Sequence, residues 1–331
     1  RGLSQVRNTE FSQTEFGNEL DGYLNRFAAV AAQVRAAKRS LRPELRDAFF
    51  AAIEYPVYAA DAHARKMLWA QKARQLANGS TQKGMFDHQA ELYHACAESQ
   101  QAYQKIRSLT EYYNEKMAGG KWRRSMNMRP RDLPVFGAPV LPTLLTDAQV
   151  KEWLEKGRKA LGNKANNNTA NTDSNILTTA KPTSGVIARN AADWQQASPG
   201  TQIVEMLGHS MKAVALPQNG KVSYTFSTDK TGDYVLRLAL IPTQPNDKGD
   251  LRFSVSIDGA QPTVYSLKEK FRSEQWKLNV LRGQALRELP LKGLQTGQHT
   301  LTICALDPHV VLDQWMVDNK ANRSFYLFPV K

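Results

Sequence analysis

The sequence has few cysteines, few histidines and no long apolar run, and each shortage excludes a class of structure. Its two cysteines, Cys96 and Cys304, fall in different predicted domains, so we expect buried free thiols and no disulfide framework. No stretch of about 18 apolar residues occurs, so we expect no membrane partner and no spanning helix. The six histidines include no pair three or four residues apart, as a zinc site on a helix requires, so we expect no metal. Gly-rich phosphate loops are also missing, and we expect no cofactor.

The chain lacks an initiating methionine and a signal peptide, since it begins Arg1-Gly2-Leu3 with no charged region before an apolar one. We therefore expect either a mature product or a fragment. The missing signal says nothing about the compartment.

Acidic residues are outnumbered, because 31 Asp and Glu face 44 Lys and Arg, which gives a net charge of +13. The densest basic cluster contains Lys121, Arg123, Arg124, Arg129 and Arg131. No basic-zipper region, zinc-finger spacing or aromatic RNA-binding signature accompanies it. We expect a solvated basic surface and no nucleic-acid partner, while binding of an acidic glycan stays open.

Helical periodicity dominates the first 118 residues. Apolar side chains recur at steps of three and four, which predicts a helix over about 12–39, a second from Pro43 to Asn78 and a third over about 81–118. Pro56 should kink or split the second helix, because proline removes a backbone donor. Long helices with short connections predict antiparallel neighbours in a bundle.

Proline and asparagine mark the middle of the chain. Prolines exclude regular helix over 119–145, which we interpret as an extended apolar strap lying on the bundle. A short capped helix is predicted over 147–161. Residues 163–182, rich in Asn and Thr, have almost no side chains to bury and predict a linker. The predicted helical domain is therefore 1–162.

After the predicted linker, apolar and polar residues alternate with a period of two. Val222, Tyr224 and Phe226 alternate with polar residues, and Gly-containing turns separate several such runs. This pattern predicts an antiparallel, jelly-roll-like β-sandwich over 183–331. The predicted fold class is thus a multidomain chain, first an antiparallel helical bundle and then a β-sandwich.

Two stretches resemble one known family. The first carries Tyr112-Tyr113-Asn114-Glu115 and Gly119-Gly120-Lys121-Trp122-Arg123, and the second carries Leu207-Gly208-His209-Ser210, Gly249-Asp250-Leu251-Arg252-Phe253, Gly297-Gln298-His299-Thr300-Leu301 and Asp307-Pro308-His309-Val310-Val311-Leu312-Asp313. Together they resemble the C-terminal half of glycoside hydrolase family 115, which contains xylan α-1,2-glucuronidases. The chain departs from the family pattern at its close, where Leu327-Phe328-Pro329-Val330 stands in place of a Gly-Pro-Pro-Glu-like ending.

The resemblance implies an accessory role. In the family a mixed domain and a catalytic barrel precede the bundle and the sandwich, so no catalytic residue is carried onto this sequence and the chain alone should be inactive. We expect it to brace its own barrel, shape the cleft for glucuronoxylan and mediate a homodimer. The parent protein is expected in the periplasm or outside the cell. Two alternatives stay open: a stand-alone carbohydrate-binding module, and a structural interaction protein without glycan binding.

The candidate cleft or interface residues are Trp122, Arg123, Arg124, Tyr113 and Asn114. An indole stacks on a sugar face, and a guanidinium pairs bidentately with a uronate. The alternative is that Trp122 packs between bundle and strap while the arginines cap helix carbonyls.

Two further sets of residues have structural interpretations. The carboxylates Asp132, Asp307 and Asp313 are expected to be ordinary turn and surface groups. Trp194, Trp276 and Trp315 fall in or beside alternating segments, so core packing is expected for each, with a sugar platform as the alternative.

Overall fold

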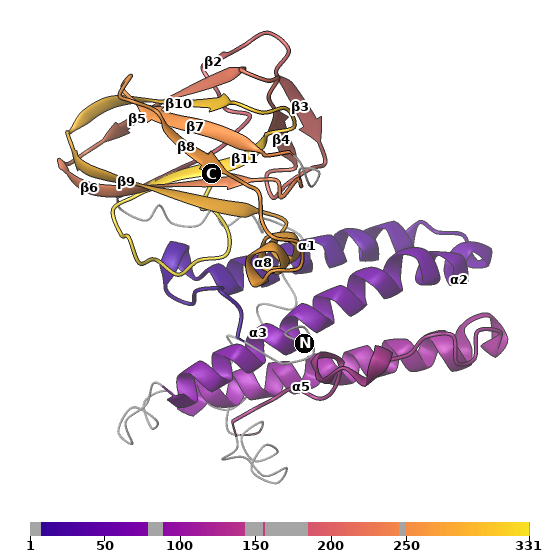
Figure 1. Cartoon of the computed structure of the whole chain (residues 1–331). Coiled ribbons are helices and arrows are strands. Elements are labelled where there is room, and N and C mark those ends of the chain that lie inside the picture. Colours follow the sequence, from indigo (N-terminus) through magenta and orange to yellow (C-terminus); the bar gives the residue numbers. More distant parts are fainter. Residues whose placement is uncertain (1–7, 79–88, 143–154, 156–184, 245–248, 331) are drawn as a thin grey trace. The chain divides into compact units, whose positions relative to one another are not determined.

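The computed structural model describes residues 8–78, 89–142, 155, 185–244 and 249–330. It divides into two compact units, one of residues 1–14 and 18–178 and the other of residues 15–17 and 179–331. The first is helical and the second is built of antiparallel strands (Figure 1). The predicted fold class, helices followed by a sandwich, is confirmed. The proposed linker over 163–182 and the short helix over 147–161 lie outside the described residues, apart from position 155, so those boundaries stay predictions.

Three long helices form the described part of the helical unit. They are α1 (Glu19–Arg39), α3 (Tyr55–Asn78) and α5 (Gln89–Glu111). Side-chain contacts show that α3 and α5 run antiparallel, because the Ser99 hydroxyl donates to the Lys66 carbonyl at 2.6 Å while Tyr55 and Thr110 meet at 3.2 Å nearer the other end. The first helix begins later than predicted, at Glu19, because Phe16 in the preceding turn has a left-handed backbone, with φ of 56°.

The second predicted helix is interrupted as Pro56 requires. It consists of η3 (Pro43–Leu45), α2 (Arg46–Phe49), the π-helical turn η4 (Phe50–Glu54) and then α3. Proline lacks an amide hydrogen and its ring presses on the carbonyl of the preceding turn. A wider π turn directly before it relieves this crowding.

Helix α5 continues into the π turn η5 (Tyr112–Lys116) and the 3-10 turn η6 (Met117–Gly120). The strap follows, with short 3-10 turns η7 (Pro130–Asp132) and η8 (Pro134–Phe136). It contacts α3 through Lys66, whose side chain is buried and donates to the carbonyl oxygens of Val135 at 2.7 Å and Gly137 at 3.0 Å. A lysine from the helix thus satisfies backbone acceptors that the proline-rich segment leaves without ladder partners.

Two antiparallel sheets form the second unit. The larger has the order β3 (Gln202–Glu205), β4 (Lys212–Ala215), β11 (Val311–Asp318), β6 (Gly232–Leu240) and β9 (Ala285–Leu294), with β1 (Val186–Asn190) also paired to β11. The smaller has the order β2 (Gln196–Ala197), β5 (Lys221–Thr228), β10 (Gly297–Ala305), β7 (Arg252–Ile257) and β8 (Thr263–Ser266). All eight residues of β11 are buried, and this strand pairs with β1, β4 and β6.

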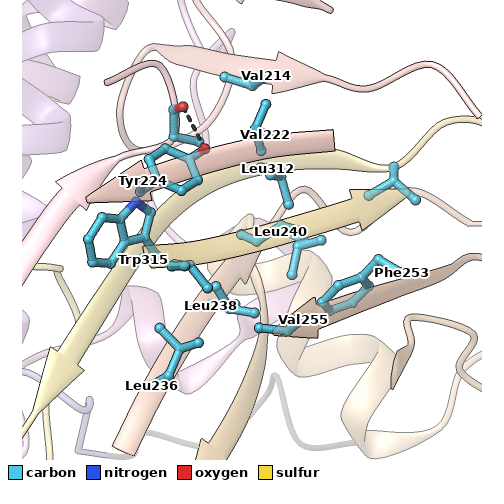
Figure 2. Packing of buried hydrophobic residues seen from close by; sticks show 14 of the residues in the cluster. Val214, Val222, Tyr224, Leu236, Leu238, Leu240, Phe253, Val255, Leu312 and Trp315 are labelled. Atoms are coloured by element: carbon cyan, nitrogen blue, oxygen red, sulfur yellow. Dashed lines mark hydrogen bonds between the residues drawn. The ribbon is translucent and has the colours of Figure 1, made fainter. Parts of the chain in front are cut away.

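The core lies between the two sheets and draws alternate residues from both (Figure 2). Tyr224 packs on Trp315 with ring centroids 5.3 Å apart, and its hydroxyl donates to the Ala191 carbonyl at 2.8 Å. Trp315 is buried here and Trp194 packs against the same core, as predicted. Trp276 is different, because it lies on a helix, α8 (Glu274–Arg282), and meets Phe271 at 5.1 Å. Its assignment to a strand pattern was wrong.

Candidate functional site

A hollow of about 530 Å³ lies in the helical unit between the end of α5 and the loop that follows it. Its lining consists of Arg107, Thr110, Glu111, Asn114, Glu115, Arg124, Met126, Asn127 and Met128. Two predicted residues, Asn114 and Arg124, therefore line one hollow.

Asn114 fixes the loop that closes the hollow. Its side-chain amide donates to the Met126 carbonyl at 3.0 Å, and its oxygen accepts from the Met126 amide at 2.9 Å. An asparagine that meets a backbone unit at both its donor and its acceptor acts like one residue of a β ladder. Asn114 thus fixes the loop that carries Arg124, using one of its two amide hydrogens and one lone pair of its oxygen.

Arg124 and Arg107 place two guanidinium groups on the lining, together with the carboxyl groups of Glu111 and Glu115. Arg124 has a left-handed backbone with φ of 62°, an uncommon conformation for a residue with a side chain. Both signs of charge next to the apolar Met126 suit a ligand that has a carboxylate, hydroxyl groups and an apolar face.

Arg123 and Trp122 lie outside this lining. The Arg123 Nε donates to a Glu115 carboxylate oxygen at 3.0 Å, and both side chains are exposed, so this ion pair adds little stability. Trp122 is 43% exposed, with the Lys121 ammonium 5.3 Å from the centre of its ring. The part of the Trp122 ring that stays exposed is available for stacking.

Tyr113 turns away to an aromatic cluster. Its ring lies 5.0 Å from Tyr55 and 6.2 Å from Phe50, and Phe50 also meets Tyr112 at 4.6 Å. These contacts join the end of α5 to the π turn before α3. The structure therefore gives Tyr113 packing partners and does not bring it to the hollow.

Sequence reasoning missed three charged lining residues, Arg107, Glu111 and Glu115. They are spaced four residues apart, which places them on one helix face that continues through Asn114 and into η5. That spacing was a visible signal, but a charged face on a long helix is ordinarily solvated. Only the fold of the loop over this face makes it a hollow.

The expected surface role of Asp313 was wrong. This carboxylate is fully buried at a β-bulge in β11 and accepts hydrogen bonds from the His209 amide at 2.9 Å, the Ser210 amide at 3.0 Å and the Gln284 side chain at 2.6 Å. Gly208 passes so close that a Cβ there would lie 2.3 Å from its oxygen. The Leu207-Gly208-His209-Ser210 segment is thus a loop wrapped around a buried carboxylate.

Asp307 is a structural carboxylate of the same unit. It accepts from the Arg252 guanidinium at 2.9 and 3.0 Å, and these bonds lower the pKa of Asp307 below its usual value. A carboxyl group held ionised in this way is a poor general acid. Asp132 lies exposed in the turn η7.

The described residues contain no group of three or more His, Cys, Asp and Glu side chains arranged to hold a metal ion. None of the described helices combines the length and the apolar character that crossing a bilayer requires. Cys96 is buried, which raises the pKa of its thiol to about 12 and makes it unreactive at neutral pH.

Comparisons with known proteins relate this architecture to glycoside hydrolases. The profile of the glycosyl hydrolase family 115 C-terminal domain matches residues 182–331. A solved family 115 4-O-methyl-α-glucuronidase with specificity for decorated arabinogalactans is similar over 95% of this chain, with 29% identity and a TM-score of 0.70, while the chain covers 34% of that protein.

A carbohydrate-binding module shows a weaker similarity. The C-terminal family 6 carbohydrate-binding module of a laminarinase from Zobellia galactanivorans matches 40% of this chain and 99% of the module at 12% identity, and its TM-score of 0.30 is too low to support an argument. A search among curated proteins gave no significant match.

These two matches support an accessory domain of a glycoside hydrolase. More specifically, residues 182–331 match the C-terminal domain of glycosyl hydrolase family 115, and the similarity to a family 115 enzyme extends over most of the chain, in agreement with the sequence resemblance.

Proposed function

We propose that this chain works as the C-terminal supporting region of a longer α-glucuronidase. The observation that carries the proposal is the similarity over 95% of the chain to one third of a family 115 enzyme, because it runs through both the helical and the sandwich unit. The buried carboxylates support it. Asp313 is held by amide groups and Asp318 by two arginines, which suits structure better than proton transfer.

Within that enzyme, the region braces the catalytic barrel and contributes one wall of the substrate cleft. The lining of the hollow supports this part of the proposal. Arg107 and Arg124 would pair with a uronate carboxylate, the Met126 side chain would meet the apolar face of a sugar ring, and the exposed Trp122 would stack on the next unit of the glycan.

The substrate class is a polysaccharide that carries glucuronic acid or its 4-O-methyl ether. Glucuronoxylan follows from the sequence resemblance, and the matched enzyme is specific for decorated arabinogalactans. Both polymers are too large to enter a cell, which supports a periplasmic or extracellular location.

Self-association is the third part of the proposal. The helical unit exposes apolar side chains, among them Val30, Ile53 and Tyr112, at 40–45% of their surface. A symmetric pair of chains is the common way to cover such residues. Sedimentation velocity over a wide concentration range tests this: we expect a concentration-dependent dimer, and a single monomeric species throughout would contradict it.

The enzymatic test compares the isolated chain with the longer protein. We expect the chain alone to release no uronic acid from aldouronic acids, glucuronoxylan or decorated arabinogalactan. In the longer enzyme, Arg124→Ala should raise KM by roughly 10-fold with kcat unchanged, since a substrate-binding interaction is lost. Arg131→Ala, at an exposed arginine that does not line the hollow, is the matched control.

Two results would refute this function. One is turnover by the isolated chain that disappears when a carboxylate of the chain is mutated. The other is an unchanged KM in Arg124→Ala together with tight glycan binding by the isolated chain, which would favour a stand-alone binding module.

A further inference from the structure

The sandwich unit is completed by three residues from far upstream. The chain leaves the helical unit after residue 14, contributes Glu15–Gly17 (η2) to the sandwich unit and returns at residue 18. In Figure 1 this indigo turn lies beside the yellow loop after β11. The Phe16 side chain is 4% exposed and packs with Ala188, Ala239, Met316, Phe325 and Phe328.

These apolar partners form a socket that belongs to the sandwich. Ala188, Ala239 and Met316 come from β1, β6 and β11. Phe325 and Phe328 come from the segment after β11 and meet each other at 5.3 Å, and Phe16 lies 6.0 Å from Phe325 with its ring edge-on. A buried phenylalanine held by aromatic and aliphatic neighbours contributes a large apolar area.

Glu15 lies next to this socket and forms ion pairs with its basic residues. The Arg323 side chain is fully buried and donates to both oxygens of Asp318, at 2.6 and 2.8 Å, while Arg237 donates to the same carboxylate at 2.7 Å. Two buried guanidinium groups thus share one buried carboxylate. Glu15 accepts from Arg323 and lies 3.2 Å from the Lys320 ammonium, so it supplies negative charge where the sandwich has an excess of positive charge.

The backbone of the turn adds a third observation. Phe16 has φ of 56° and the next described residue with a side chain, Asn18, has φ of 70°. Left-handed backbone at residues other than glycine costs free energy and persists where surrounding contacts fix it. The contacts that offset this cost for Phe16 are those of the socket, together with the Arg323 guanidinium 5.2 Å above its ring.

The geometry points to a peptide-docking socket on the sandwich whose ligand is the acidic-aromatic turn Glu15-Phe16-Gly17 of this chain. The turn is a latch that holds the sandwich to the polypeptide of the helical unit independently of the segment at 163–182. The socket recognises two groups of its ligand. Arg323 and Lys320 bind its carboxylate, and the apolar partners bind its aromatic ring. This inference does not depend on the proposed function.

The test uses the full chain with a protease recognition sequence inserted between residues 163 and 182. After cleavage, we expect the two fragments to remain together in size-exclusion chromatography and sedimentation at micromolar concentration. Phe16→Ala removes the buried ring and should weaken their association by roughly 100-fold. Glu15→Gln keeps the shape and removes the charge, and should weaken it by roughly 10-fold.

Phe27→Ala is the matched control. Phe27 is also a phenylalanine near the N-terminus, but it is half-buried on α1 against Tyr23, with the rings 5.3 Å apart. We expect association as in the unaltered chain, and circular dichroism should show all variants folded. The latch is refuted if the unaltered fragments separate at micromolar concentration, if Phe16→Ala associates as tightly as the unaltered protein, or if Phe27→Ala weakens association equally.

Discussion

His63 gives the helical unit a pH-dependent stability. It lies on α3 under the strap, with its ring 5.7 Å from that of Phe136 and the buried Lys66 one turn further along. Burial, followed by the charge of Lys66, lowers the pKa of His63 from 6.5 to about 4. The imidazole is therefore neutral at pH 7, and a proton placed on it in the folded state is unfavourable.

The direction of the pH effect follows from linkage. Since the folded-state pKa lies below the unfolded value, the unfolded chain binds the proton first as pH falls. The contribution is fully present above pH 6.5 and is lost as pH falls toward about 4. The whole pKa shift corresponds to ~3 kcal/mol of unfolding free energy, of which ~2 kcal/mol is lost between pH 7 and pH 5. His63 is half-buried, so solvent screens part of this, and we expect about 1 kcal/mol over that interval.

The assay is urea unfolding followed by helical circular dichroism at pH 7 and pH 5. His63→Leu should reduce the loss of unfolding free energy between these pH values by about 1 kcal/mol relative to the unaltered chain. The matched control is His94→Leu, a histidine on α5 whose ring lies 5.1 Å from that of Trp69, measured at the same two pH values. An equal loss in the unaltered chain and in His63→Leu would refute the reasoning.

Three further predictions concern single contacts. Lys66→Met removes the donor to two strap carbonyls and should cost about 2 kcal/mol, seen in thermal unfolding and in faster proteolysis of the strap. Gly208→Ala drives a methyl group into Asp313 and should lower the stability of the sandwich by about 3 kcal/mol in calorimetry, whereas Gly259→Ala, with φ of 72° but open space, should cost about 1 kcal/mol. Asp307→Asn should destabilise the sandwich at pH 7, and this difference should shrink as pH falls below 3.8 toward the lowered pKa of the carboxyl, because its ion pair with Arg252 stabilises the fold only while the group is ionised.

The regular elements were predictable because their patterns are local. Alternation over Val222–Phe226 and spacing at four residues along α3 and α5 each reflect one buried face, and the structure shows both. Pro56 was also informative, since its effect on the backbone depends on its own ring and not on distant partners. Of the five candidate residues, two line the hollow, Asn114 and Arg124.

The failures have a different cause. Asp313 is buried because amide groups about a hundred residues earlier satisfy it, and no local pattern reports such partners. Trp276 lies in a helix of nine residues, capped by Ser273 and ended by Gly283, which is too short for apolar periodicity to distinguish it from a strand. Phe16 continues the apolar spacing of the first predicted helix, yet it belongs with its packing partners to the sandwich unit.

The position of β11 has a consequence for the order in which the protein is made. This strand pairs with β1, β4 and β6, and all three precede it in the chain. During synthesis the ribosome therefore releases three strands of the larger sheet before the strand that joins them exists. These strands cannot pair with β11 until residues 311–318 have been synthesised. A nascent chain that stalls before this point exposes unpaired strand edges, which chaperones bind and which favour aggregation.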